Sequence, residues 1–227
     1  MTQKLPTVFI PALLCDERLY GEVIATLGDQ IEAHVMLSPK ATLAESVADI
    51  LARAPHRFAL VGTSYGGNLA MQVALAAPDR VTALWLMGCD PAGPRKGGPD
   101  LAAGLEATPE AVFGMLASLV VHKNAVGPAA TFSAMATTVG GLAGAAQARA
   151  IASRDDITAR LPELTMPVLA LWGAEDALVP AAVGRLLAEA LPNAQFHELA
   201  GCGHLPTLEN PQASAALFAA FLLAQQH

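Results

Sequence analysis

Residues 58–67 read Phe-Ala-Leu-Val-Gly-Thr-Ser-Tyr-Gly-Gly, and this stretch decides the fold. The apolar run at 58–61 is typical of a buried strand, and the run at 68–76 predicts a helix. A G-x-S-x-G pattern between a strand and a helix predicts a turn so tight that only glycine fits two residues either side of the serine. The Ser64 hydroxyl would then stand at a helix N-terminus, where free N–H groups favour negative charge. The pentapeptide alone leaves open an ordinary glycine-rich turn.

Two more polar residues follow strand-like runs. Asp176 comes shortly after the apolar run at 167–172, and His204 after the run at 194–199. Ser64, Asp176 and His204 therefore each follow a candidate strand. A loop histidine without a catalytic role is the alternative interpretation of His204, but Gly201 and Gly203 just before it give the loop the freedom to place the ring beside a serine.

Motif and order together resemble the α/β-hydrolase superfamily, in which the triad occurs in the order Ser, Asp, His. The resemblance covers nearly the whole chain and implies that Ser64 is the nucleophile. It makes His204 the general base and then the acid, and it makes Asp176 the carboxylate that orients the imidazole. Asp90 is an alternative acid, because it follows the strand-like run at 81–87 and some lipases of this superfamily carry the acid there.

The same resemblance assigns an oxyanion hole, which needs two backbone N–H groups directed at one oxygen. Tyr65, the residue after the nucleophile, would supply one. Leu13 would supply the other from Pro-Ala-Leu-Leu-Cys-Asp at 11–16, which is similar to the Pro-Gly-Leu-Leu-Cys-Asp loop of a bacterial subset. Ala12 replaces the glycine, so a positive φ at that position would be strained.

Composition favours a cytoplasmic enzyme without a membrane segment. The net charge of −7 and the scatter of the 13 Lys and Arg residues argue against a nucleic-acid partner. No apolar run reaches the roughly 18 residues of a membrane span, and the N-terminus lacks a signal-peptide pattern. We expect a monomer or homodimer. Three cysteines suggest no disulfide framework, and free thiols are favoured over a zinc site, with no cofactor expected. The three are Cys15, Cys89 and Cys202.

Alternating strands and helices predict an α/β fold with a parallel sheet covered by helices on both faces. Because only six residues precede the first strand, we expect six strands, without the antiparallel hairpin that usually opens the α/β-hydrolase fold. Residues 1–90 and 161–227 would form the core, and residues 91–160 a helical cap. The expected strands are 7–11, 31–37, 57–63, 81–88, 167–173 and 194–199. The expected core helices are 16–27, 42–54, 66–77, 180–191 and 211–224.

The cap is expected to have helices near 100–106, 109–122, 128–138, 141–153 and 155–160. Its apolar residues recur at helical spacing, which ordinary cap packing would also explain, but a lid needs an apolar underside toward the substrate. The candidate lining residues are Leu14, Phe113, Leu116, Phe132 and Met135.

The cations of the cap form no evident anion clamp, so small apolar acyl groups are favoured over polyanions. They are Arg95, Lys96, Lys123, Arg149, Arg154 and Arg160. The resemblance thus implies a serine hydrolase that acts on small-molecule carboxylic esters. A cofactor-free lyase, a C–C hydrolase, an acyl or thioester hydrolase, and a non-catalytic ligand receptor of the same fold remain alternatives.

Overall fold

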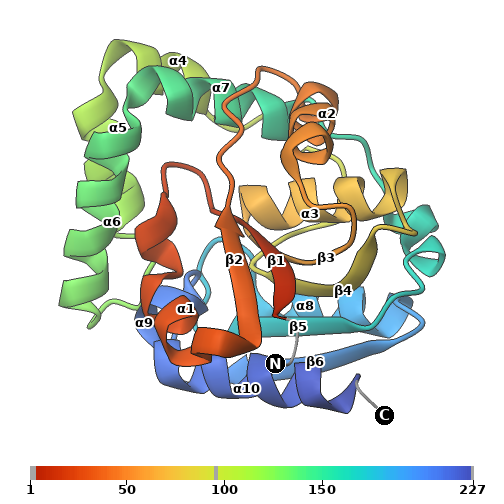
Figure 1. Cartoon of the computed structure of the whole chain (residues 1–227). Helices are drawn as coiled ribbons and strands as arrows, with labels where there is room; N and C mark the ends of the chain where they lie inside the picture. The colour runs from red at the N-terminus through yellow and green to blue at the C-terminus, as the bar shows by residue number, and fades with distance from the viewer. Residues whose placement is uncertain (1–3, 95–96, 226–227) are drawn as a thin grey trace.

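The computed structural model describes residues 4–94 and 97–225, and its centre is a six-stranded sheet in which neighbouring strands are parallel (Figure 1). The strand order is β2-β1-β3-β4-β5-β6. Phe9 pairs with Val35 on one side and with Val61 on the other, which places the first strand inside the sheet. The predicted fold class is confirmed. The strands are β1 (Leu5–Ile10), β2 (Ile31–Val35), β3 (Phe58–Thr63), β4 (Val81–Met87), β5 (Val168–Gly173) and β6 (Ala194–Leu199).

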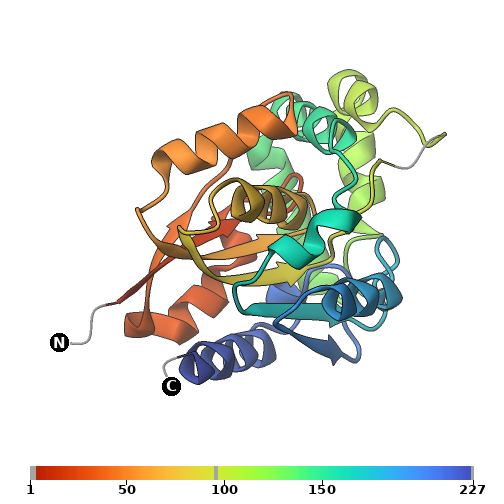
Figure 2. The same cartoon turned by 90° about the vertical axis from the view of Figure 1, so that its right-hand side faces the viewer.

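Helices cover both faces of the sheet, as Figure 2 shows. Trp85 on β4 points to one face, where its ring stacks on Phe218 at 4.4 Å between centroids. Trp172 on β5 points to the other face and packs so closely on Gly184 that a Cβ there would lie 2.4 Å from the indole. The first face is covered by α1 (Gly21–Leu27) and α10 (Pro211–Ala224), and the second by α2 (Leu43–Arg53), α3 (Tyr65–Ala76) and α8 (Ala181–Ala190).

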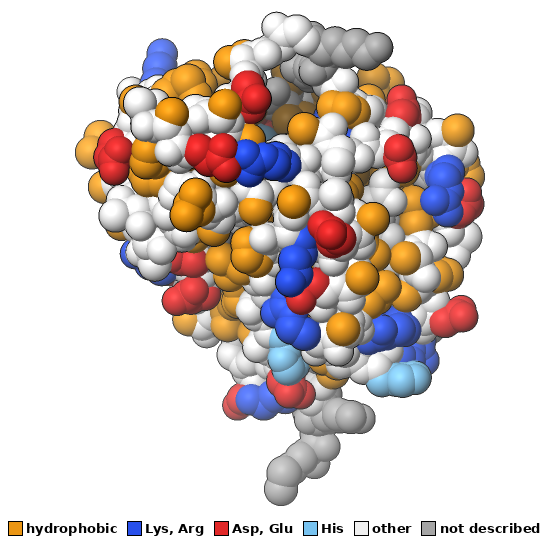
Figure 3. Space-filling view, turned by 90° about the horizontal axis from the view of Figure 1, so that it is seen from above, with side chains coloured by type: hydrophobic (Ala, Val, Ile, Leu, Met, Phe, Trp, Pro, Cys, Tyr) orange, Lys and Arg blue, Asp and Glu red, His pale blue; other side chains and the backbone are white. Residues whose placement is uncertain are grey.

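Between β4 and β5 the described residues form four helices, called the cap helices below, which stand beside the sheet in Figure 1. They share one apolar cluster with the sheet, since Phe132 and Met135 belong to the same buried group as Trp85. In Figure 3, which looks onto the cap side, basic side chains lie beside acidic ones, and Arg149 of the cap pairs with Glu106 at 2.6 Å. The helices are α4 (Leu101–Ala107), α5 (Pro109–Ala117), α6 (Val126–Val139) and α7 (Gly141–Ala152).

Several predicted boundaries shift. The helix expected at 16–27 is divided, because Asp16 caps the 3-10 turn η1 (Glu17–Leu19) before α1 begins at Gly21. The helix expected at 109–122 ends at Ala117, and the helix expected at 155–160 is a 3-10 segment, η3 (Thr158–Glu163). Two short elements were not expected, η2 (Gly28–Gln30) and α9 (Pro206–Glu209). The linker cations Arg95 and Lys96 lie outside the described residues.

Two further features concern the helices. Thr42 and Glu45 form a capping box at the start of α2. Within residues 4–94 and 97–225, no helix combines the length and the apolar character needed to cross a bilayer.

Candidate active site

Ser64 occupies the turn between β3 and α3 with φ 57° and ψ −117°, a left-handed backbone that a non-glycine residue rarely adopts. Its N–H donates to the Met87 carbonyl at 2.8 Å. A Cβ on Gly62 would lie 2.3 Å from the Gly66 carbonyl oxygen, and one on Gly66 would lie 2.0 Å from that of Ile10. The glycines of the motif are therefore required by contact with backbone that cannot move aside.

His204 and Asp176 form a buried pair, with 2.7 Å between the imidazole Nδ1 and the Asp176 Oδ2. The other carboxylate oxygen, Oδ1, accepts the N–H groups of Leu178 and Val179, both at 2.9 Å. Because Asp176 is thus held as an acceptor, Nδ1 carries the proton and Nε2 is left to accept one. No hydrogen bond joins Ser64 to His204 in the described part of the chain, although both line one cavity. Such bonds often tighten only when substrate is bound.

The loop of His204 is fixed by a second carboxylate. Glu209 Oε1 accepts the N–H groups of Gly203 and Leu205 at 3.1 Å, and its Oε2 accepts that of His122 at 2.7 Å. The backbone N–H of His204 donates to the Val120 carbonyl at 3.1 Å. The backbone on both sides of His204 is therefore tied to α9 and to the segment that follows α5.

Asp90, the alternative acid, follows β4 and lines the same cavity. Its Oδ1 accepts the N–H of Ala92 at 3.0 Å, in a short turn at the start of the linker. The carboxylate that bonds to the imidazole is that of Asp176. The geometry therefore favours Asp176 for the orienting role.

The loop after β1 brings Leu13 to the cavity that Ser64 and Tyr65 line. None of the hydrogen bonds of the described residues uses the N–H of Leu13 or of Tyr65. The strained position is not Ala12, as the sequence suggested, but Leu14, which has φ 62°. Alanine in place of glycine therefore carries no backbone cost in this loop.

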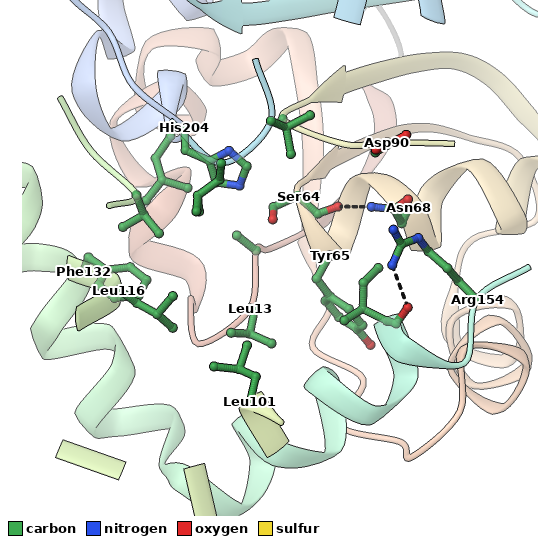
Figure 4. A pocket seen from close by; sticks show the side chains of 17 residues that line it. Leu13, Ser64, Tyr65, Asn68, Asp90, Leu101, Leu116, Phe132, Arg154 and His204 are labelled. Atoms are coloured by element: carbon green, nitrogen blue, oxygen red, sulfur yellow. Dashed lines mark hydrogen bonds between the residues drawn. The ribbon is translucent and has the colours of Figure 1, made fainter. Parts of the chain in front are cut away.

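The cavity has a volume of about 340 Å³ and two kinds of wall. Figure 4 shows Leu101, Leu116 and Phe132 on one side of Ser64. The polar side chains Asn68, Asp90 and Arg154 lie on the other side. The remaining lining residues are Ala12, Leu13, Tyr65, Gly88, Val120, Ile151, Leu178, Val179, His204 and Leu205.

Comparison with known proteins agrees with this geometry. Residues 24–217 match the sequence profile described as the Alpha/beta hydrolase family. The chain belongs to the alpha/beta hydrolase family. It is similar to a solved thermophilic esterase from Thermogutta terrifontis, with a TM-score of 0.85 and 20% identity over 99% of this chain and 92% of the other. An enol-lactonase from Burkholderia xenovorans LB400 is comparable, with a TM-score of 0.85 and 19% identity over 97% and 92%.

Two groups of relatives resemble this chain in sequence. A 2-hydroxy-6-oxononadienedioate/2-hydroxy-6-oxononatrienedioate hydrolase of Paraburkholderia phymatum is 30% identical over 72% of this chain and 61% of its own. The chain thus spans about three fifths of that relative. A pimeloyl-[acyl-carrier protein] methyl ester esterase of Pectobacterium carotovorum is 26% identical over 90% of this chain and 89% of its own.

Of the five residues expected to face the substrate, two line the cavity and three do not. Leu116 and Phe132 line the cavity, whereas Leu14, Phe113 and Met135 do not. Those three are buried in the cluster that the cap shares with the sheet. The Leu14 side chain lies against α7, where a Cβ on Gly144 would be 2.4 Å from Leu14 Cδ2.

Several residues that line the cavity were not predicted, although their positions in the sequence could have indicated them. Asn68 lies one helical turn after Ser64, and its side chain donates to the Ser64 carbonyl at 3.1 Å. Leu205 directly follows the catalytic histidine candidate, and Leu178 follows the acid by two residues. Arg154 was counted among the cap cations without a role. It lines the cavity and donates to three carbonyl groups, those of Ala92, Gly93 and Ile151.

The three cysteines are buried and free, as the sequence favoured. Burial raises the pKa of each thiol above its ordinary range, so the reactive thiolate is scarce at neutral pH. Among residues 4–94 and 97–225, no group of three or more His, Cys, Asp or Glu side chains could hold a metal ion. The thiols are therefore poor rivals of Ser64 as nucleophile.

Proposed function

We propose that this chain hydrolyses carboxylic esters with small apolar acyl groups through an acyl-enzyme on Ser64. The observation that carries the proposal is the cavity, because the apolar wall of Leu101, Leu116 and Phe132 adjoins Ser64 and His204. An apolar wall beside a nucleophile selects an apolar acyl group, since each buried methylene contributes about 0.8 kcal/mol. About 340 Å³ suits a small substrate.

In the proposed reaction, Ser64 Oγ attacks the ester carbonyl carbon while its proton passes to His204 Nε2. The carbonyl oxygen becomes an oxyanion that accepts the N–H groups of Leu13 and Tyr65. The bond to the alcohol then breaks, and the His204 proton goes to the leaving oxygen. Water gives a proton to His204 and attacks the acyl-enzyme, which releases the acid and restores Ser64.

A panel of p-nitrophenyl esters of increasing acyl length tests this proposal, with wild type and Ser64→Ala compared. We expect kcat/KM to rise from acetate and to peak among short acyl chains. Ser64→Ala should remove both turnover and covalent labelling by a fluorophosphonate. A preference for palmitate over butyrate, or labelling that survives Ser64→Ala, would reject the proposal.

Hydrolysis of an oxo-dicarboxylate is the second candidate, suggested by the name of the Paraburkholderia relative. Arg154 in the cavity wall favours it, because a carboxylate substrate needs a cation. Against it, the Arg154 guanidinium already donates to three carbonyl groups. Cleavage of a 2-hydroxy-6-oxo-dienedioate, followed by loss of its absorbance, separates the two. Faster turnover of that compound than of any p-nitrophenyl ester would favour the second candidate.

A further inference from the structure

Gln147 is a buried polar residue of the cap helix α7 that bonds to the loop after β1. It is 2% exposed, and its side-chain Oε1 accepts the N–H of Leu14 at 3.0 Å across 133 residues of sequence. Without Gln147 Oε1, the buried backbone N–H of Leu14 would have no hydrogen-bond acceptor, which is costly. The bond therefore favours one arrangement of the loop after β1 relative to helix α7.

Leu14 is the residue of this loop that needs outside support. Its φ of 62° is a left-handed conformation that a leucine adopts only when its surroundings impose it. α7 imposes it at two points one turn apart, since Gly144 closely contacts the Leu14 side chain and Gln147 accepts its N–H. The Cys15 N–H closes the turn on the Ala12 carbonyl at 3.0 Å.

The neighbouring peptide group is the proposed oxyanion donor. Leu13 lines the cavity beside Ser64, and its N–H makes no hydrogen bond within the described residues. The bond to Gln147 fixes the plane of the peptide group between Leu13 and Leu14, and so limits how the Leu13 N–H can rotate. Oxyanion donors act only when held in place before the reaction.

We propose that Gln147 is a positioning residue of the oxyanion hole, through which the cap sets the direction of the Leu13 N–H. The proposal rests on acyl transfer at Ser64. Gln147 lies outside the cavity wall, so it acts on the transition state through the loop and not on substrate binding. Loss of its acceptor oxygen should therefore lower kcat and leave KM nearly unchanged.

Two variants at this position separate the acceptor from the packing. Gln147→Met keeps the length of the side chain and removes the acceptor, whereas Gln147→Glu keeps an acceptor oxygen. Thr138→Val is the matched control, because it removes a different hydrogen bond between cap and core, from Arg18 to Thr138 Oγ1 at 2.7 Å. That bond does not involve Leu14.

The measurement is kcat and KM with p-nitrophenyl butyrate, together with Ki for 1-butaneboronic acid, which forms a tetrahedral adduct on a serine. Removing an oxyanion donor costs roughly 10²–10³ in kcat, so for a misdirected donor we expect Gln147→Met to lose roughly 10- to 100-fold. Ki should rise in proportion, and KM should change little. Gln147→Glu and Thr138→Val should stay near wild type.

A Gln147→Met enzyme with unchanged kcat, or with its loss confined to KM, would overturn the proposal. A loss that Gln147→Glu shares in full would also overturn it. If Gln147→Met does not fold, Gln147→Asn, shorter by one methylene, should show an intermediate loss of kcat. The rate of Ser64 phosphonylation by a fluorophosphonate keeps the test separate from the ester proposal. A wild type that is labelled but hydrolyses no ester rejects the ester, and the labelling ratio of Gln147→Met to wild type still decides the role of Gln147.

Discussion

Replacing Asp176 by asparagine should preserve the shape of the site and reverse the hydrogen-bonding direction of its imidazole. Asp176 Oδ1 accepts two backbone N–H groups, those of Leu178 and Val179, so the amide oxygen of an asparagine must take that place. The amide NH₂ then faces His204 Nδ1, where Oδ2 lay at 2.7 Å. An NH₂ group can only donate, so Nδ1 must lose its proton and Nε2 must carry it.

An imidazole protonated at Nε2 cannot accept the Ser64 proton. We therefore expect Asp176→Asn to lower kcat/KM for p-nitrophenyl butyrate by roughly 10⁴, which corresponds to about 5 kcal/mol of transition-state stabilisation. The melting temperature should change little, because the buried hydrogen bonds are still paired.

Asp90→Asn is the matched control, since it makes the same chemical change at a carboxylate of the same cavity. It should cost far less than Asp176→Asn. A larger loss in Asp90→Asn than in Asp176→Asn would refute the assignment of the acid and the tautomer argument with it.

Three further outcomes are expected. Phe132→Ala should accept longer acyl chains in the p-nitrophenyl ester panel, because Phe132 closes the apolar wall, and an unchanged chain-length profile would contradict this. The same substitution should lower the free energy of unfolding by roughly 3–5 kcal/mol in a urea titration. Glu209→Gln should lower both kcat and stability, the latter by roughly 1–3 kcal/mol, since an NH₂ group would face backbone N–H groups; equal urea midpoints would count against it. A thiol reagent at pH 8 should label no cysteine until guanidinium unfolds the chain, because burial raises the pKa of all three; labelling of the native protein would disprove it. The three cysteines are Cys15, Cys89 and Cys202.

The sheet, the glycine turn at Ser64 and the places of Asp176 and His204 just past strand ends could be predicted because their requirements are local. The steric limits on Gly62 and Gly66 belong to the turn itself, so the motif reports them directly. Strand positions follow from apolar runs that must be buried on both faces. Asp176 and His204 were found because each stands just past such a run.

The cap wall could not be predicted in the same way, because it depends on how each helix rotates against the sheet. Phe132 and Met135 lie three residues apart on α6 and share one side of it, yet Phe132 borders the cavity and Met135 does not. Gln147 and Arg149 are the polar side chains of the alanine-rich helix α7, and no periodicity marks Gln147 as the buried one. The positive φ of Leu14 could not be predicted, because the glycine of similar loops directed attention to the position of Ala12.

The apolar cluster common to the cap helices and the sheet bears on how this protein could be redesigned. Phe132 and Met135 pack in the same buried group as Trp85, so exchanging the whole segment between β4 and β5 for that of a relative would remove part of the hydrophobic interior of the core. Heat or denaturant should melt both parts in one cooperative transition. A new substrate range is therefore better sought by point changes at the cavity wall than by grafting a foreign lid.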